Sequence, residues 1–238
     1  MKRFATCAMT LALCFAFSDG VRAQEKPARK NPAYEPIEDD PNLPRVLLLG
    51  DSISIGYTIP TRKVLEGKAN VHRPAANCGP TSRGVSGLKK WLGKKKWDVI
   101  HFNFGLHDLK TMPKTGKAQV SIADYEKNLK TIVAQLKETG AVLIWATTTP
   151  VQDAKTSPKT KRADKNVEAY NAVADKIMEV EKIRINDLYA AAKDGPLEEI
   201  QKKDGVHFSP KGSKRLAKRV GAAVADALKA KKPAAAGS

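Results

Sequence analysis

Short apolar runs alternate with longer amphipathic runs through residues 45–230. A short unbroken apolar run, closed by Gly or a polar turn, predicts a strand that is buried on both faces of a sheet. The first such run reads VLLLG and directly precedes Asp51 and Ser52. The predicted strands cover residues 45–49, 69–75, 97–105, 141–147 and 183–188.

Between these runs, apolar residues recur at three- and four-residue spacing, which predicts helices. The clearest helix has Ser121 as its cap and ends at Gly140. Residues 77–84 are rich in Gly, Pro, Thr and Ser and predict a loop. The alternation predicts an α/β fold, a three-layer α/β/α sandwich on a parallel sheet. The predicted helices cover residues 52–67 (interrupted by Pro60), 88–92, 121–140, 167–180, 196–202 and 209–230.

The two ends of the chain differ from this body. Basic residues precede an apolar run over residues 5–17, and Val21-Arg22-Ala23 is a small-x-small cleavage signal, so residues 1–23 predict a signal peptide cleaved near Ala23. We therefore expect a secreted or periplasmic protein. Residues 24–44 contain five prolines and predict an extended arm or linker, 45–230 form the predicted domain, and 231–238 predict a disordered tail.

Cysteine use and charge narrow the possible partners. Cys7 and Cys14 lie in the predicted signal peptide, so Cys78 alone remains and no intramolecular disulfide is expected. The formal net charge of +17 favours polyanionic partners such as an acidic polysaccharide. Nucleic acid is not expected, because no binding motif is present and aromatic residues are sparse. No long apolar stretch follows residue 17, so integral membrane contact is not expected either. We take a monomer as the default.

The candidate chemistry lies at the two ends of the predicted domain. Ser52 stands where the first strand gives way to a helix, and in open parallel sheets chemistry gathers at the carboxyl ends of strands. Asp204 and His207 lie three residues apart near the other end, a spacing that puts both on one face of a helical turn. A Ser, a His and an Asp are the groups that acyl transfer needs. No G-x-S-x-G elbow is present, which argues against the common α/β-hydrolase arrangement.

Residues 50–54 (GDSIS) and 204–207 (DGVH) resemble the first and last motifs of the SGNH (GDSL-like) hydrolases. The resemblance covers about residues 45–230 and implies a flavodoxin-like, five-stranded parallel sheet. It also implies a serine esterase without a cofactor, in which Ser52 attacks the ester carbonyl and forms an acyl-enzyme. In that family the D-x-x-H motif supplies the remaining groups: His207 would act as base and then acid, and Asp204 would orient it.

The same resemblance implies three donors for the oxyanion, of which the Ser52 N–H is the first. A second family motif, similar to residues 77–84 here, supplies a backbone N–H from Gly79, Ser82 or Gly84, and we favour Gly79. The third motif usually reads G-x-N-D, whereas residues 105–108 read GLHD and place His107 at the Asn position. A neutral imidazole has one N–H and could replace the amide.

Asn103 is the second candidate for that side-chain donor, and its alternative role is a buried, hydrogen-bonded strand residue. Asp108 could fix the tautomer of His107 or form a structural pair. A catalytic metal is not expected, because the four histidines show no H-x-x-x-H or H-E-x-x-H spacing and no cysteine pair remains.

Substrate candidates come from the loops that follow strand ends. One loop carries Lys110, and another carries Lys155 and the basic cluster 159–162; with Asp51, Lys110 and Lys155 are the predicted substrate-binding residues. Two basic loops beside the crevice favour an anionic substrate, such as an acetylated uronic-acid polysaccharide. O-deacetylation of carbohydrate is the favoured function. The alternatives are a lipid or short-chain aryl esterase, including a lysophospholipase, and a non-catalytic glycan-binding protein.

Overall fold

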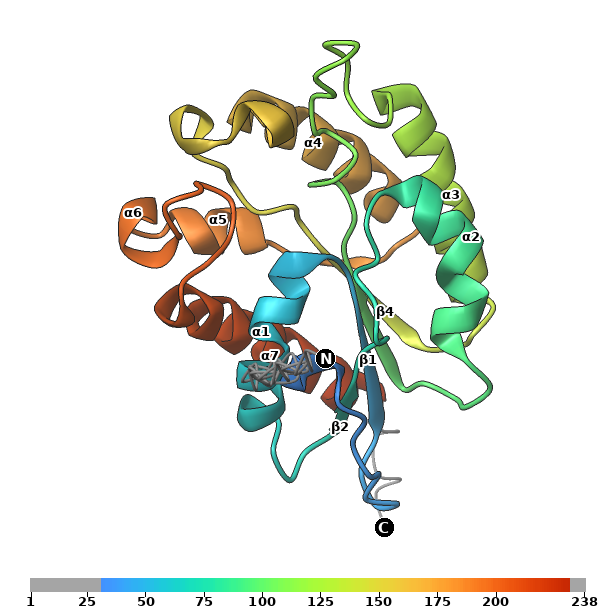
Figure 1. Cartoon of the computed structure of the whole chain (residues 1–238). Coiled ribbons are helices and arrows are strands. Elements are labelled where there is room, and N and C mark those ends of the chain that lie inside the picture. Colours follow the sequence, from blue (N-terminus) through green and yellow to red (C-terminus); the bar gives the residue numbers. More distant parts are fainter. Residues whose placement is uncertain (1–30, 232–238) are drawn as a thin grey trace, which may run out of the picture.

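The computed structural model describes residues 31–231; the predicted signal peptide, the start of the arm and the tail beyond Lys231 lie outside this range. Five parallel strands form one sheet in the order β2-β1-β3-β4-β5 (Figure 1). This confirms the predicted fold, and each predicted strand is present. The strands are β1 (Arg45–Leu49), β2 (Asn70–His72), β3 (Val99–Phe102), β4 (Val142–Ala146) and β5 (Arg184–Asn186).

Helices cover both faces of the sheet. Figure 1 shows α1 and α7 on one side and α2, α3 and α4 on the other. Each helix buries one apolar stripe against strands that are apolar on both faces, as a three-layer sandwich requires. The α-helices are α1 (Ser52–Val64), α2 (Thr81–Leu92), α3 (Ile122–Lys137), α4 (Asp164–Val180), α5 (Leu188–Lys193), α6 (Leu197–Ile200) and α7 (Pro210–Lys231), and the 3-10 helices are η1 (Pro32–Tyr34), η2 (Asp153–Lys155) and η3 (Pro158–Thr160).

The start of α2 differs from the sequence prediction. The helix begins at Thr81, within the segment predicted as a loop. Asp108 Oδ1 accepts hydrogen bonds from the backbone N–H of Thr81, at 2.9 Å, and from the Thr81 hydroxyl. A carboxylate from elsewhere in the chain thus satisfies the first turn of a helix whose own cap position, Pro80, makes no side-chain capping bond. Local sequence carries no signal of such a distant cap.

The described part of the arm, residues 31–44, packs along the edge strand β2. Asn70 Nδ2 donates to the Leu43 carbonyl at 3.0 Å, and Asp39 contacts both Arg45, at 2.9 Å, and His72, at 2.5 Å. Arg62 of α1 donates to the Glu35 carbonyl at 3.1 Å. The arm therefore covers a sheet edge that would otherwise be open.

His101 lies fully buried in β3, with Asn186 Nδ2 3.1 Å from its Nε2. Burial lowers the pKa of His101 to about 3, so the imidazole is neutral in the folded protein at neutral pH. His101 is thus a structural residue within the sheet and does not line the Ser52 cavity.

Among residues 31–231, none of the helices has the length and apolar character needed to cross a membrane.

Candidate active site

Ser52 is the first residue of α1, at the carboxyl end of β1. Its neighbour Asp51 caps the helix: Asp51 Oδ1 accepts the Ile53 N–H at 2.9 Å, and only 3% of Asp51 is exposed. The Ser52 N–H has no hydrogen-bond partner among residues 31–231. A free N–H at a helix N-terminus is suited to holding developing negative charge.

Asp204 and His207 lie in a turn stabilised by the Asp204 carboxylate itself, and not in the helical turn that the spacing suggested. Asp204 Oδ1 accepts the N–H groups of Val206, at 3.0 Å, and His207, at 2.9 Å, while Oδ2 lies 2.8 Å from His207 Nδ1. Burial alone would raise the pKa of Asp204, but these hydrogen bonds and the imidazole lower it below its usual value. Asp204 is therefore a carboxylate at neutral pH.

The two segments meet across 155 positions of sequence, where Ser52 Oγ lies 2.9 Å from His207 Nε2. Contact with the 152–155 segment places the 204–207 turn: the Gln152 N–H donates to the Gly205 carbonyl at 2.8 Å. Gly205 has φ +65°, and a Cβ there would lie 2.8 Å from the Gln152 carbonyl oxygen. Only glycine suits this left-handed, crowded position. The Ser–His–Asp chain can move a proton from Ser52 to His207 while Asp204 stabilises the imidazolium.

A cavity of about 320 Å³ opens onto this chain of hydrogen bonds. Besides Ser52, Asp204 and His207, its polar lining comes from three other segments. The β2–α2 connection contributes one side chain, the segment after β3 contributes a second, and the loop between β4 and α4 contributes four more. These residues are Asn77, His107, Lys155, Ser157, Thr160 and Arg162.

His107 is half-buried, and its imidazole has no hydrogen-bond partner among the described residues. Burial lowers its pKa, and the nearby charges of Arg162 and Lys110 lower it further, against the opposing effect of Asp51. A neutral His107 carries one N–H that can donate into the cavity. Asp108 does not bond this imidazole, because it caps α2 at Thr81, so its role is structural.

Asn103, the second candidate for the side-chain donor, is directed away from the cavity. Its Nδ2 donates to the Ala146 carbonyl at 2.8 Å and to Thr148 Oγ1 at 3.2 Å. Both amide hydrogens therefore tie the ends of β3 and β4 together. Because Asn103 does not line the cavity at Ser52, the geometry corrects the prediction that included it among the oxyanion donors.

Gly79 is the second correction. Its N–H donates to Asn77 Oδ1 at 3.0 Å, so it cannot also bind an oxyanion. The Gly84 N–H donates to the Pro80 carbonyl, and only Ser82 within residues 79–84 has a backbone N–H without a partner in the described chain. The bond from Gly79 to Oδ1 orients the Asn77 amide, whose Nδ2 makes no hydrogen bond with residues 31–231. Asn77 was not among the donors predicted from the sequence.

The predicted substrate-binding residues are divided by the structure. Lys155 lines the cavity, whereas Lys110 does not, although its positive charge helps to lower the pKa of His107. Asp51 is a buried helix cap and does not line the cavity, which corrects its assignment to substrate binding. Arg162 belongs to the basic cluster 159–162, and it does line the cavity.

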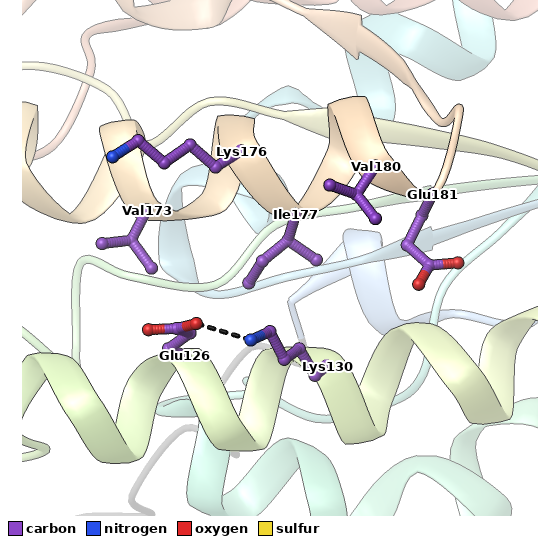
Figure 2. A pocket seen from close by; sticks show the side chains of 7 residues that line it. All are labelled: Glu126, Lys130, Val173, Lys176, Ile177, Val180 and Glu181. Atoms are coloured by element: carbon purple, nitrogen blue, oxygen red, sulfur yellow. Dashed lines mark hydrogen bonds and ion pairs between the residues drawn. The ribbon is translucent and has the colours of Figure 1, made fainter.

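A larger groove, of about 540 Å³, lies between α3 and α4. Figure 2 shows Val173, Ile177 and Val180 on α4 facing the Glu126–Lys130 ion pair on α3. Its lining contains no Ser, Cys or His, so the Ser52 cavity is the better candidate for chemistry.

Within residues 31–231, no three His, Cys, Asp or Glu side chains are grouped as metal ligands.

Residues 48–215 match the sequence profile of the GDSL-like Lipase/Acylhydrolase family. The chain belongs to this family. Its members are acyl ester hydrolases, which agrees with the serine, histidine and carboxylate at the cavity. No curated protein is significantly similar to the chain in sequence.

Solved structures share the fold. A lipase/acylhydrolase from Enterococcus faecalis superposes with a TM-score of 0.65 at 20% identity, covering 77% of this chain and 96% of that one. An acetyl xylan esterase gives 0.64 at 17% identity, covering 76% and 99%. Axe2, an acetylxylan esterase from Geobacillus stearothermophilus, gives 0.61 at 18% identity, covering 74% and 92%.

Proposed function

We propose that this family member is an exported serine esterase that removes O-acetyl groups from carbohydrate. The observation that carries the mechanism is the chain from Ser52 Oγ to His207 Nε2, at 2.9 Å, and from His207 Nδ1 to Asp204, at 2.8 Å. Ser52 Oγ attacks the ester carbonyl as its proton passes to His207. His207 then gives that proton to the departing sugar oxygen, and water releases the acyl group by the same steps in reverse order.

The oxyanion of each tetrahedral intermediate would be held by the Ser52 N–H, the His107 imidazole and the Asn77 amide. All three groups lie on residues that line one cavity, and none has another acceptor among residues 31–231. Such donors stabilise the transition state more than the ground state, because negative charge develops only as the carbonyl is attacked.

Two features support carbohydrate as the substrate. The cavity is modest, polar side chains stand at nine of its eleven lining positions, and acetyl xylan esterases share the fold. Leu106 and Val206 add apolar surface to the lining, so the substrate test includes an ester without a sugar.

The test measures acetate release from acetylated xylan, acetylated oligosaccharides and p-nitrophenyl acetate by the mature protein and by Ser52→Ala. Release from saccharides that disappears in the variant supports the proposal. Cleavage confined to aryl or lipid esters favours the short-chain esterase, and saccharide binding without Ser52-dependent release favours a non-catalytic glycan binder.

Export is proposed from the pattern of residues 1–23. Fractionation of a bacterial host that expresses the full chain should place the protein outside the inner membrane. Its N-terminal sequence should begin at or near Gln24. Full-length protein retained in the cytoplasm would overturn this part of the proposal.

A further inference from the structure

Arg162 is a buried cation on the wall of the Ser52 cavity. Only 7% of the residue is exposed. Its Nε donates to the Leu106 carbonyl at 2.7 Å, and its Nη1 donates to the Thr160 carbonyl at 2.9 Å. These two bonds fix the plane and direction of the guanidinium.

The remaining terminal nitrogen of Arg162 is free to bind a ligand. Nη2 makes no hydrogen bond with residues 31–231, and it is not among the fully buried polar atoms that lack a partner. Arg162 lines the cavity beside Ser52, so this accessible donor belongs to a residue of the cavity wall.

Arg162 also lacks a counter-ion. No carboxylate of the described chain lies within 4.0 Å of its guanidinium. Burial lowers the pKa of Arg162, while the charges of Asp51 and Asp204 act in the opposite direction. Both of those carboxylates are already engaged, Asp51 with the Ile53 N–H and Asp204 with His207. Buried cations in proteins are normally paired with an anion, so this guanidinium is available to pair with an anionic ligand.

We infer that Arg162 and Lys155 form a carboxylate-binding subsite beside Ser52, which selects an ester on a uronic acid sugar. Arg162 presents the N–H groups of Nη2, oriented by the bonds of Nε and Nη1, to a carboxylate oxygen, and the exposed Lys155 adds a second positive charge to the same wall. The inference rests on the proposed esterase function and goes further by naming the sugar class and the residue that recognises it.

The test uses a matched pair of substrates: an O-acetylated oligogalacturonide, and the same material with its carboxylates converted to amides. Wild type is expected to have a kcat/KM at least about 10-fold higher for the charged member, because a charge-assisted hydrogen bond is lost with the amide. Arg162→Gln should abolish this preference mainly through KM, and Arg162→Lys should keep part of it. Arg83→Gln removes the same charge from the exposed face of α2, outside the cavity, and should keep the full preference.

Other outcomes overturn the inference. If wild type does not distinguish the two substrates, there is no carboxylate subsite. If Arg162→Gln lowers kcat equally on both substrates and on p-nitrophenyl acetate, Arg162 serves the oxyanion or holds the loop instead.

Two further measurements test the subsite if the variant does not fold or if wild type is inactive. Should Arg162→Gln not fold, inhibition of wild-type p-nitrophenyl acetate hydrolysis by unacetylated oligogalacturonide, with its amide as control, tests the same subsite. Should wild type show no Ser52-dependent hydrolysis, the proposed function fails by itself, and calorimetric titration with the two oligosaccharides then decides the subsite separately.

Discussion

Ser52 Oγ and His207 Nε2 lie 2.9 Å apart, but the two residues are held in place by very different parts of the structure. Ser52 follows a strand whose residues 46–49 are fully buried, and a buried carboxylate caps its helix. His207 belongs to a turn whose Asp204 and His207 side chains are 48% and 42% exposed. The turn is held by its own carboxylate and by contact with the 152–155 segment.

This difference indicates how the site should respond to change. Ser52, the proposed nucleophile, and His107 are positioned by the packed core, so replacing their functional atoms should alter chemistry without moving the backbone. His207, the proposed base, is positioned by a few local hydrogen bonds and one glycine, so small backbone changes there should cost activity while the global stability stays close to that of wild type.

Asp204→Asn, in the exposed 204–207 turn, should have the largest effect on activity. The asparagine keeps an oxygen for the N–H groups of Val206 and His207, but its NH₂ group faces His207 Nδ1 and favours the wrong tautomer. We expect kcat for p-nitrophenyl acetate to fall about 10⁴-fold with little change in Tm. Asp226→Asn, on the exposed face of α7, is the control and should keep full activity. An equally active Asp204→Asn enzyme would contradict the orienting role.

Variants of His107 test the proposed oxyanion donor on the core-supported side of the cavity. His107→Ala removes an N–H donor and should lower kcat by about 10²- to 10³-fold. His107→Asn restores an amide N–H at the same position and should recover most of that loss. Kinetics on one acetyl ester, with circular dichroism to verify folding, compare the two variants. If the asparagine variant is as slow as the alanine variant, the imidazole does not act as a simple donor.

Gly205→Ala tests whether the exposed turn depends on its backbone. The new Cβ would collide with the Gln152 carbonyl and displace His207, so we expect activity to fall by up to about 10²-fold. Gly116→Ala is a close control, because Gly116 also has φ +65° but a Cβ there meets nothing within 4 Å. It should cost about 1 kcal/mol of stability through strain alone and leave activity intact. Equal activity losses in both variants would assign the effect to strain.

The buried His101 of β3 should make the stability of the fold depend on pH. Burial lowers the pKa of His101 to about 3 in the folded protein. In the unfolded chain the same imidazole has its ordinary pKa of about 6.5, so between these pH values only the unfolded chain binds the proton. Stability should therefore fall as pH drops from about 6.5 towards 3, by up to about 2 kcal/mol between pH 6.5 and 5. Urea unfolding of wild type and His101→Gln at both pH values measures this, and the variant should lose part of the slope. An unchanged slope would mean that other groups dominate the pH dependence.

The sequence by itself determined the α/β alternation, the five strands and the residues that meet as Ser52, His207 and Asp204. These features follow from burial patterns and from motifs that are local, so the printed order of residues contains them. The helix start at Thr81 was missed because its cap, Asp108, comes from another segment.

The tertiary structure decided which polar groups remain free to act. Gly79 and Asn103 have suitable chemistry, but non-local or turn contacts consume their N–H groups. In the sequence, Asn77 belongs to a predicted loop and Arg162 to a basic cluster, yet both residues line the cavity and keep a side-chain donor that has no partner among residues 31–231. A donor's availability depends on every acceptor around it in space, and local sequence patterns do not record those neighbours.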